Sequence, residues 1–246
     1  MSAPRDIPDA LAAALRGARH VCVLTGAGVS AESGVPTFRE AQEGLWANYR
    51  AEDLATPEAF QADPGLIWRW YRWRRGVVAD VEPNAGHYAI AAMAELVPRL
   101  TLITQNVDNL HRRAGSRDII EFHGNLFEDR CFAEGTVQVA DDSHEIPTCP
   151  QCGANLRPGV VWFGEAIPEQ ALTDACAAAA DCDVFLSVGT SSLVYPAAGL
   201  ADLAQQNDAV TVEINPNPTM QVERFDFALA GNSGTVLPEL VELLSP

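Results

Sequence analysis

Apolar and polar positions follow two alternating rhythms along this chain. Short apolar runs typical of buried strands recur, and they are VCVLT (21–25), LTLITQN (100–106), DIIEFHG (118–124), VFLSVGT (184–190) and AVTVEIN (209–215). Between them lie alanine-rich segments of helical character, such as AGHYAIAAMAELV (85–97) and EQALTDACAAAADC (169–182). Strands that alternate with crossover helices predict an α/β fold with a doubly wound, Rossmann-like parallel sheet.

Two segments break this rhythm. Residues 40–85 are rich in Trp, Tyr and Arg and are interpreted as helices broken by Pro57 and Pro64, whereas residues 125–165 are rich in turn-forming residues. We expect them to form a smaller second lobe inserted into the larger one. The predicted nucleotide-binding domain then comprises residues 1–39, 86–124 and 166–246, and the small domain comprises residues 40–85 and 125–165.

The apolar runs end in small or polar residues, which are GAGVS, TQNVDNLH, EFHGN, VGTSS and EINPN. Ligands of doubly wound sheets bind at the carboxyl ends of the strands. We therefore expect these five strand ends to converge on one crevice.

The first strand end has the spacing of a dinucleotide-binding turn. Gly26-x-Gly28-x-x-Ala31 directly follows the run 21–25. The first glycine of such a motif makes the tight turn, the second lets the backbone approach a pyrophosphate, and the small third residue lets a helix pack closely. The alternative is a glycine-rich turn that binds no ligand.

The next two strand ends carry groups that suit catalysis. Gln105, Asn106 and Asp108 can bond a carboxamide and ribose hydroxyls, although Asn and Asp also cap helices. His123 supplies an imidazole, the best general base near neutral pH, although a lone histidine is commonly only packed in the fold.

Composition narrows the choice of partners. The net charge of −17 argues against nucleic acid, because phosphate binding requires Lys and Arg. All 16 basic residues are arginine, which excludes a Schiff-base lysine and a P-loop lysine. The first 20 residues are too polar for a signal peptide, and no apolar run is long enough to cross a bilayer. We expect a cytoplasmic protein without a membrane partner.

Taken in order, these motifs resemble the sirtuins, a family of NAD-dependent protein-lysine deacylases. The resemblance runs from about residue 10 to residue 245 and is carried by GAGVSAESGVPTFR, TQNVDNLH, FHGN, CPQCG, LRPGVVWFGE, VGTSS and INPN. It implies NAD as the cofactor and acylated-lysine proteins or peptides as substrates. The cofactor-binding residues that it implies are Gly26, Ala27, Gly28, Ser30, Phe38, Arg39, Gln105, Asn106, Asp108, Gly189, Thr190, Ser191, Asn215, Asn217 and Ser233.

The same resemblance assigns the chemistry. Asn106 and Asp108 hold the nicotinamide end, the acyl oxygen attacks the anomeric carbon as nicotinamide leaves, and His123 is the base for the ribose hydroxyl that attacks the resulting alkylamidate. Free lysine and O-acyl-ADP-ribose are the products. Val161, Trp162 and Phe163 are expected to line the acyl-lysine channel and to pair with the peptide.

The stretch WRWYRWRRG (68–76) bears on which acyl group is removed. Tyr71 and Arg74 are three residues apart and share one face of a helix. Together they can bind a distal carboxylate, and within the sirtuin resemblance Tyr-x-x-Arg at this location marks a preference for succinyl- and malonyl-lysine over acetyl-lysine. The alternative is an amphipathic helix whose arginine stems cover apolar surface.

The cysteines depart from the family pattern. Sirtuins usually hold zinc with two C-x-x-C pairs, and here Cys149 and Cys152 form one pair, whereas the first reads C-F-A-E, with Cys131 followed by Glu134. Three cysteines with Glu134 or His144 could bind zinc, and otherwise the module folds without metal.

Two other functions remain open at this stage. The same cofactor cleavage could transfer ADP-ribose onto a protein, which would leave a permanent adduct. A catalytically silent NAD or ADP-ribose sensor is the second, but it would not need the base His123.

Overall fold

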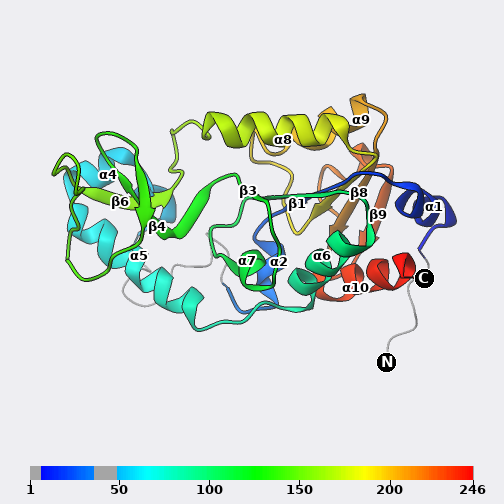
Figure 1. Ribbon diagram of the computed structural model, residues 1–246, viewed down its shortest axis with the longest axis horizontal. Helices are drawn as coiled ribbons and strands as arrows, with labels where there is room; N and C mark the ends of the chain where they lie inside the picture. The colour runs from blue at the N-terminus through cyan, green and yellow to red at the C-terminus, as the bar shows by residue number, and fades with distance from the viewer. Residues whose placement is uncertain (1–6, 36–48, 246) are drawn as a thin grey trace.

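A computed structural model describes residues 7–35 and 49–245, with a large lobe and a small lobe at opposite ends of an elongated molecule (Figure 1). The large lobe contains six parallel strands in the order β3-β2-β1-β7-β8-β9. Their bounds are β1 Val21–Thr25, β2 Leu100–Thr104, β3 Ile119–Glu121, β7 Val184–Val188, β8 Val210–Asn215 and β9 Phe227–Ala230. The predicted doubly wound α/β sheet is confirmed.

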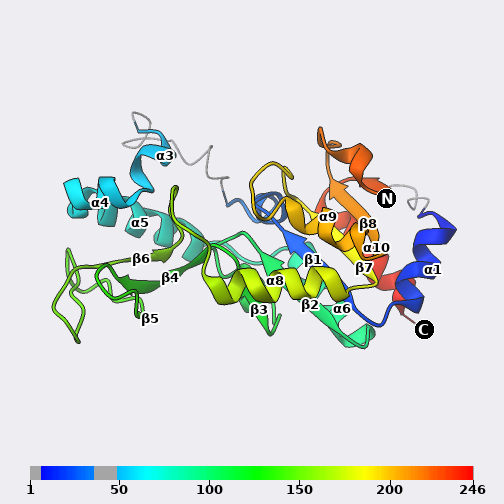
Figure 2. The same ribbon diagram turned by 90° about the horizontal axis from the view of Figure 1, so that it is seen from above.

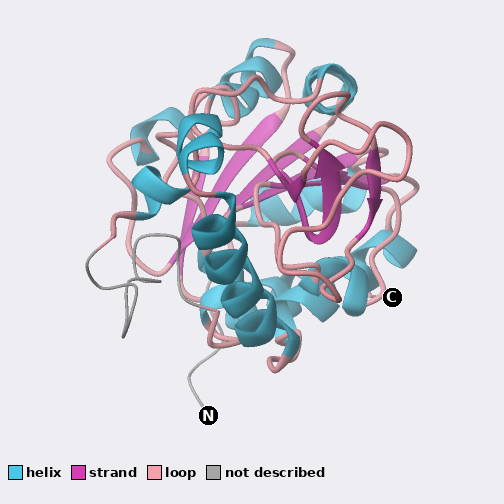
Figure 3. Ribbon diagram, turned by 90° about the vertical axis from the view of Figure 1, so that its left-hand side faces the viewer, coloured by secondary structure: helices cyan, strands magenta, loops and turns pink. Residues whose placement is uncertain are grey.

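Both faces of this sheet are covered by helices (Figures 1 and 3). One face packs on α1 (Asp9–Gly17), α6 (Ala85–Leu96) and α10 (Ser233–Leu244), and the other on α8 (Glu169–Asp181) and α9 (Gly199–Gln206). A hydrophobic core lies on each face of the sheet, and alternate residues of β1 point into the two cores. Val21 and Val23 belong to the core with α1, α6 and α10, and Cys22 and Leu24 belong to the core with α8 and α9. Burial on both faces explains why the strands are continuously apolar.

The small lobe combines an antiparallel sheet with helices. Its sheet has the order β5-β4-β6, with β4 Gly124–Cys131, β5 Val137–Val139 and β6 Leu156–Val160. The helices α3 (Ala51–Leu54), α4 (Pro57–Ala62) and α5 (Pro64–Ala79) lie beside it (Figure 2). Its core of buried aromatic and aliphatic side chains is separate from the two cores of the large lobe. The predicted domain limits stay a prediction.

Pro57 and Pro64 mark the interruptions between the helices of the small lobe. Each is the first residue of its helix, and the side chains of Thr56 and Asp63 accept hydrogen bonds from the N–H groups of Ala59 and Leu66. Proline is suited to this place because the first N–H groups of a helix have no partner within it. The predicted breaks between helices are thus found directly before the two prolines.

The two sheets are joined by a very short link. β3 ends at Glu121 and β4 begins at Gly124, so only Phe122 and His123 lie between these two strands of the large and the small sheet. The remaining short elements are α2 (Gly28–Ala31), α7 (Leu110–Arg113) and η2 (Val222–Arg224). In the part of the chain that the structure describes, every helix is too short or too polar to span a bilayer.

Candidate active site

The carboxyl ends of β1, β2 and β7 are tied together by backbone hydrogen bonds. The N–H of Gln105 donates to the carbonyl of Thr25 over 3.0 Å, and the N–H of Gly26 donates to the carbonyl of Val188 over 3.0 Å. The Gln105 amide reaches across the same gap to the Thr190 hydroxyl at 3.1 Å. Three of the five strand ends predicted to share a crevice are therefore in contact with one another.

The glycine loop presses backbone against backbone. The Gly28 N–H donates to the Gly189 carbonyl over 2.8 Å, and a Cβ on Gly28 would lie 2.7 Å from the Gly189 Cα. No side chain can occupy that space without moving one of the two loops. Ala27 precedes α2, and Gly28 is its first residue. A loop with bare backbone at the carboxyl end of a central strand is suited to pyrophosphate.

Ser30 is the centre of a polar network at the floor of this loop. Its hydroxyl donates to Asp108 Oδ2 over 2.7 Å and accepts from Asn106 Nδ2 over 3.1 Å. His87 Nε2 lies 3.3 Å from the same hydroxyl, and His87 Nδ1 accepts from the N–H of Asn84. Ser30, His87 and Asp108 are buried, so their relative positions are fixed by these bonds.

Asp108 also accepts a hydrogen bond at the start of a helix, next to the N-cap residue Asn109. Its Oδ1 accepts from the Leu110 N–H over 3.0 Å at the start of α7, while its Oδ2 receives the Ser30 hydroxyl. The two interpretations of this residue are therefore compatible, because each uses a different oxygen of the carboxylate.

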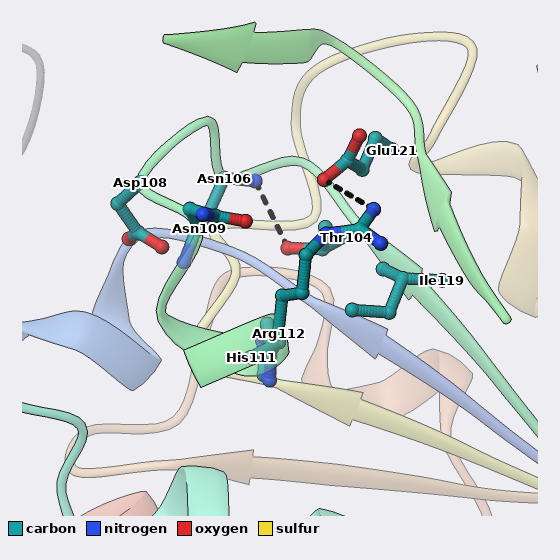
Figure 4. A pocket seen from close by; sticks show the side chains of 8 residues that line it. All are labelled: Thr104, Asn106, Asp108, Asn109, His111, Arg112, Ile119 and Glu121. Carbon is teal, nitrogen blue, oxygen red and sulfur yellow. Dashed lines mark hydrogen bonds and ion pairs between the residues drawn. The ribbon is translucent and has the colours of Figure 1, made fainter. Parts of the chain in front are cut away.

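A second chain of hydrogen bonds lies beneath Asn106. The Thr104 hydroxyl accepts from the Asn106 N–H over 3.1 Å and from the Thr25 hydroxyl over 2.9 Å, and Thr25 in turn lies 2.9 Å from His111 Nε2. Because Thr25 donates to Thr104, His111 must donate to Thr25 through Nε2. Asn106, Thr104 and His111 also line a small pocket with Asp108, Asn109, Arg112, Ile119 and Glu121 (Figure 4).

His111 remains neutral in the folded protein. It is 2% exposed, and its Nδ1 has no hydrogen-bond partner. Burial, and then the neighbouring His87 ring 4.7 Å away, lower the pKa of His111 to about 3. The network under Asn106 is therefore held by a neutral imidazole at physiological pH.

His123 is oriented as a base by the carbonyl of Gln105. Its Nδ1 lies 3.0 Å from that carbonyl oxygen, which can only accept, so Nδ1 carries the proton and Nε2 keeps its lone pair. Burial lowers the pKa of His123, against a smaller rise from the Gln105 hydrogen bond. The imidazole is therefore unprotonated near pH 7.

The remaining predicted cofactor residues divide into buried and exposed groups. Asn215, at the end of β8, is buried and donates to the Thr190 carbonyl over 3.0 Å. Ser233 is buried at the start of α10, where its hydroxyl donates to Glu32 Oε2 over 3.4 Å. Ser191 and Asn217 are exposed at the rim. Phe38 and Arg39 lie outside the described residues.

Tyr71 and Arg74 lie on α5, on the side of the helix that meets the end of β6. The phenol of Tyr71 is buried and accepts a hydrogen bond from Trp162 Nε1 over 2.9 Å. The Arg74 guanidinium carbon lies 5.9 Å from the Tyr71 ring centroid and 5.1 Å from that of Trp70. Burial raises the pKa of Tyr71 to about 12, so the phenol keeps its proton.

Two other arginines of α5 fix the small lobe. Arg75 is 4% exposed and forms ion pairs with Asp129 at 2.6 Å and with Asp142 at 2.7 Å. Arg72 pairs with Asp142 at 3.3 Å and donates to the carbonyls of Glu145 and His144. These contacts join the helix to β4 and to the loop that follows β5.

Val161 and Phe163 follow β6 at the junction of the lobes. The Val161 N–H donates to the His123 carbonyl over 2.8 Å, and the Phe163 N–H donates to the Ala55 carbonyl over 2.9 Å. Val161 is partly buried and Phe163 is 50% exposed. Their backbone N–H groups thus donate to carbonyl groups of this chain.

The cysteine module can hold a tetrahedral metal. Ligand atoms of Cys131, Glu134, Cys149 and Cys152 all lie within 4.8 Å of one another, and the Cys131 and Cys152 sulfurs are 3.5 Å apart. A Zn–S bond of about 2.3 Å places tetrahedral thiolates about 3.8 Å apart, so this set fits zinc. A zinc ion bound there would cross-link the turn after β4 to the turn before β6.

Sequence reasoning missed His87, His111 and Glu32. Each acts through a partner far away in the chain, since Ser30 and His87 are 57 residues apart and Thr25 and His111 are 86 residues apart. No local pattern marks such pairs. His111 stands within the motif TQNVDNLH, but nothing in the spacing assigns its imidazole to Thr25.

Known proteins share this arrangement. A model of the Sir2 family matches residues 26–196. The chain belongs to the Sir2 family. Among its relatives, a protein from Methylococcus capsulatus named NAD-dependent protein deacylase is 50% identical over 97% of this chain and 98% of its own length. NAD-dependent protein deacylase 1 of Pseudomonas aeruginosa is 50% identical over 94% of this chain and 97% of its own length.

Solved Sir2 structures agree in fold. A Sir2 homolog–NAD complex superposes with a TM-score of 0.91 at 41% identity, covering 99% of this chain and 96% of that one. A Sir2 complex with a deacetylated peptide and O-acetyl ADP-ribose has a TM-score of 0.83 at 28% identity, covering 95% and 97%. The sirtuin family, the NAD cofactor and the NAD-dependent protein deacylase class predicted from the sequence are confirmed.

Proposed function

We propose that this NAD-dependent protein deacylase removes succinyl and malonyl groups from protein lysine in preference to acetyl groups. The observation that carries the proposal is the pairing of Arg74 with the buried phenol of Tyr71 beside Trp162. A guanidinium and a phenol on one wall match the distal carboxylate of an acidic acyl group. An acetyl group has no distal carboxylate to form such a charged pair.

The other arginines of α5 contact acidic residues of the small lobe. Arg72 and Arg75 are engaged with Asp142 and Asp129 in the small lobe, and Arg69 faces Glu145 at 3.7 Å. Burial lowers the pKa of Arg74, against the charges of Tyr71 and Asp108, which raise it. Its guanidinium lies near the Tyr71 ring, which is where the proposal requires a cation.

The residues of the crevice would then divide the work as follows. NAD, when bound, supplies an anomeric carbon that loses nicotinamide and accepts the acyl oxygen. The network of Asn106, Ser30 and Asp108 would hold the nicotinamide end, and His123 Nε2 would take the proton from the ribose hydroxyl. Because Nδ1 of that imidazole is fixed on the Gln105 carbonyl, the lone pair of Nε2 keeps one direction.

Substrate chains are expected to lie along the end of β6. β6 is an edge strand of the small sheet in the part of the chain that the structure describes, and Val161 and Phe163 follow it at the junction of the lobes. An extended peptide that adds as a strand uses the main-chain groups of such an edge. The acyl-lysine side chain would then pass between Val161 and the Tyr71–Arg74 face.

The test compares succinyl, malonyl and acetyl versions of one peptide with NAD, following free lysine and O-acyl-ADP-ribose by mass spectrometry. For Arg74→Met we expect kcat/KM for the succinyl peptide to fall about 10- to 150-fold, the loss of a charged hydrogen bond of about 1.5–3 kcal/mol. Turnover of the acetyl peptide should change by less than about threefold. Arg69→Met, on the same helix, is the matched control.

Three outcomes would count against the proposal. A wild-type enzyme that hydrolyses the acetyl peptide fastest contradicts the acyl preference, while keeping the deacylase chemistry. An equal loss of succinyl- and acetyl-peptide turnover in Arg74→Met would mean that Arg74 supports the structure and does not bind the acyl carboxylate. A lasting gain of mass on the peptide by one ADP-ribose would instead indicate transfer onto protein.

A further inference from the structure

The Tyr71 phenol has one hydrogen-bond partner among the described residues, and this partner is Trp162. The indole Nε1–H donates to the phenol oxygen over 2.9 Å, and both residues are buried, with 1% and 2% of their surface exposed. An indole N–H can only donate, so the phenol oxygen is the acceptor in this bond. The proton of the phenol is therefore left to a second acceptor.

The phenol keeps this proton. Burial raises the pKa of Tyr71 to about 12, whereas the charge of Arg74 and the Trp162 hydrogen bond lower it. The neutral phenol can thus donate to an acceptor while it accepts from the indole. Hydrogen bonds in such a chain polarise one another, so a phenol that accepts from Trp162 is a stronger donor toward an anion.

Arg157 and Glu165 hold Trp162 in place. The Arg157 guanidinium carbon lies 3.5 Å from the Trp162 ring centroid, and this arginine is buried and forms an ion pair with Glu165. Glu165 Oε2 also accepts the backbone N–H of Trp162 over 2.8 Å. Both the ring and the backbone of Trp162 are therefore fixed, and its indole N–H keeps its direction toward the phenol.

We infer that Trp162 is a positioning residue for acyl selectivity, which directs the hydroxyl proton of Tyr71 toward the distal carboxylate of the acyl group. The inference rests on the proposed function, because only an acidic acyl group supplies that acceptor. Arg74 supplies the charge for the carboxylate, and Trp162 sets the direction of the neutral hydrogen bond. Removal of an acetyl group does not depend on this direction.

The test replaces the indole by a ring without a donor. Trp162→Phe keeps an aromatic ring beside Arg157 and removes the N–H. We expect kcat/KM for the succinyl peptide to fall about 2- to 12-fold, mainly through KM, which is the loss of one neutral hydrogen bond. The value for the acetyl peptide should change by less than about twofold.

Trp68→Phe is the matched control. It removes another buried indole N–H of the same lobe, which donates to the Leu156 carbonyl over 3.0 Å. Its ratio of succinyl to acetyl turnover should equal that of the wild type, even if its stability is lower.

A double-mutant cycle separates positioning from packing. Tyr71→Phe removes the hydroxyl that Trp162 directs. In the Tyr71→Phe background, Trp162→Phe should cause no further loss of succinyl-peptide turnover. A loss as large as in the wild-type background would overturn the inference, because Trp162 would then act by packing alone.

A second measurement does not require a folded Trp162→Phe variant. In ¹⁵N-labelled protein without NAD, the Trp162 indole signal is identified by its upfield move in Tyr71→Phe. The wild-type signal should move downfield when the succinyl peptide is added and less when the acetyl peptide is added, because donation by the phenol to a carboxylate strengthens the bond from the indole. Equal movement with the two peptides would overturn the inference.

Failure of this inference differs from failure of the proposed function. A wild type that favours the acetyl peptide contradicts the proposed function, and with it the carboxylate on which the inference depends. A wild type that favours the succinyl peptide, while Trp162→Phe keeps the same ratio of succinyl to acetyl turnover, leaves the proposed function standing and overturns the role of Trp162.

Discussion

Acid should destabilise this protein through His111. The side chain is 2% exposed, its Nδ1 has no partner, and burial together with His87 lowers its pKa to about 3. In the unfolded chain the imidazole returns to its ordinary pKa of about 6.5. Between these values the unfolded protein binds a proton that the folded protein does not, so stability is lost as the pH falls below about 6.5.

The size of the effect follows from the gap in pKa. At pH 5 the unfolded His111 is about 1.5 pH units below its pKa, which corresponds to about 2 kcal/mol in favour of unfolding. A His111→Gln variant lacks the titrating group while its amide can still reach the Thr25 hydroxyl. It should therefore lose about 2 kcal/mol less than the wild type between pH 7.5 and pH 5.

Urea unfolding followed by tryptophan fluorescence at the two pH values measures this difference. The comparison uses the change with pH and not the absolute stability, so destabilisation of His111→Gln at pH 7.5 does not obscure it. His123 titrates in both proteins, and its contribution cancels, whereas the contribution of His87 changes with that of His111 because the two rings are neighbours. His144→Gln, which removes an exposed histidine, should keep the wild-type change. A wild-type change in His111→Gln as well would refute the assignment of a neutral buried His111.

Three further predictions follow. His123→Ala should lower kcat about 10²- to 10⁴-fold without weakening NAD binding. The acid limb of the wild-type kcat/KM profile should lie below pH 6.5, because burial lowers the pKa of His123, and a limb above pH 6.5 contradicts this. Gly28→Ala should raise the Kd for NAD at least about tenfold by calorimetry, since its Cβ meets Gly189, whereas Gly17→Ala, with open space around its Cβ, should not. Arg75→Met should cost about 3–5 kcal/mol of unfolding free energy by leaving buried Asp129 unpaired; loss equal to that of Arg69→Met would contradict it.

The large sheet was predictable because its strands are apolar on both faces. The run 21–25 coincides with β1, and the other four runs each contain a strand of the sheet. β9 (Phe227–Ala230) escaped detection, since this edge strand has only four residues and only Leu229 among them is fully buried. The antiparallel sheet of the small lobe was also missed, because Pro158 and Gly159 interrupt β6 and the pattern of β4 is largely polar.

The candidate site was predictable only as far as its residues stand in compact motifs. The strand ends with Gly28, Asn106 and His123 could be read because each motif is local. The support beneath them could not, because His87 and His111 come from α6 and α7 and are brought to Ser30 and Thr25 only by folding. Trp162, expected to line the channel, also binds the Tyr71 phenol, a contact between residues 91 positions apart.

His123 stands in the two-residue link between β3 and β4 and contacts both lobes. His123 belongs to neither sheet: its imidazole is tied to the Gln105 carbonyl of the large lobe, and its own carbonyl accepts from Val161 of the small lobe. The orientation of the imidazole therefore depends on both lobes, because one contact of His123 comes from each. A substitution that shifts either Gln105 or Val161 should change the direction of the Nε2 lone pair, even though both residues make these contacts with main-chain atoms.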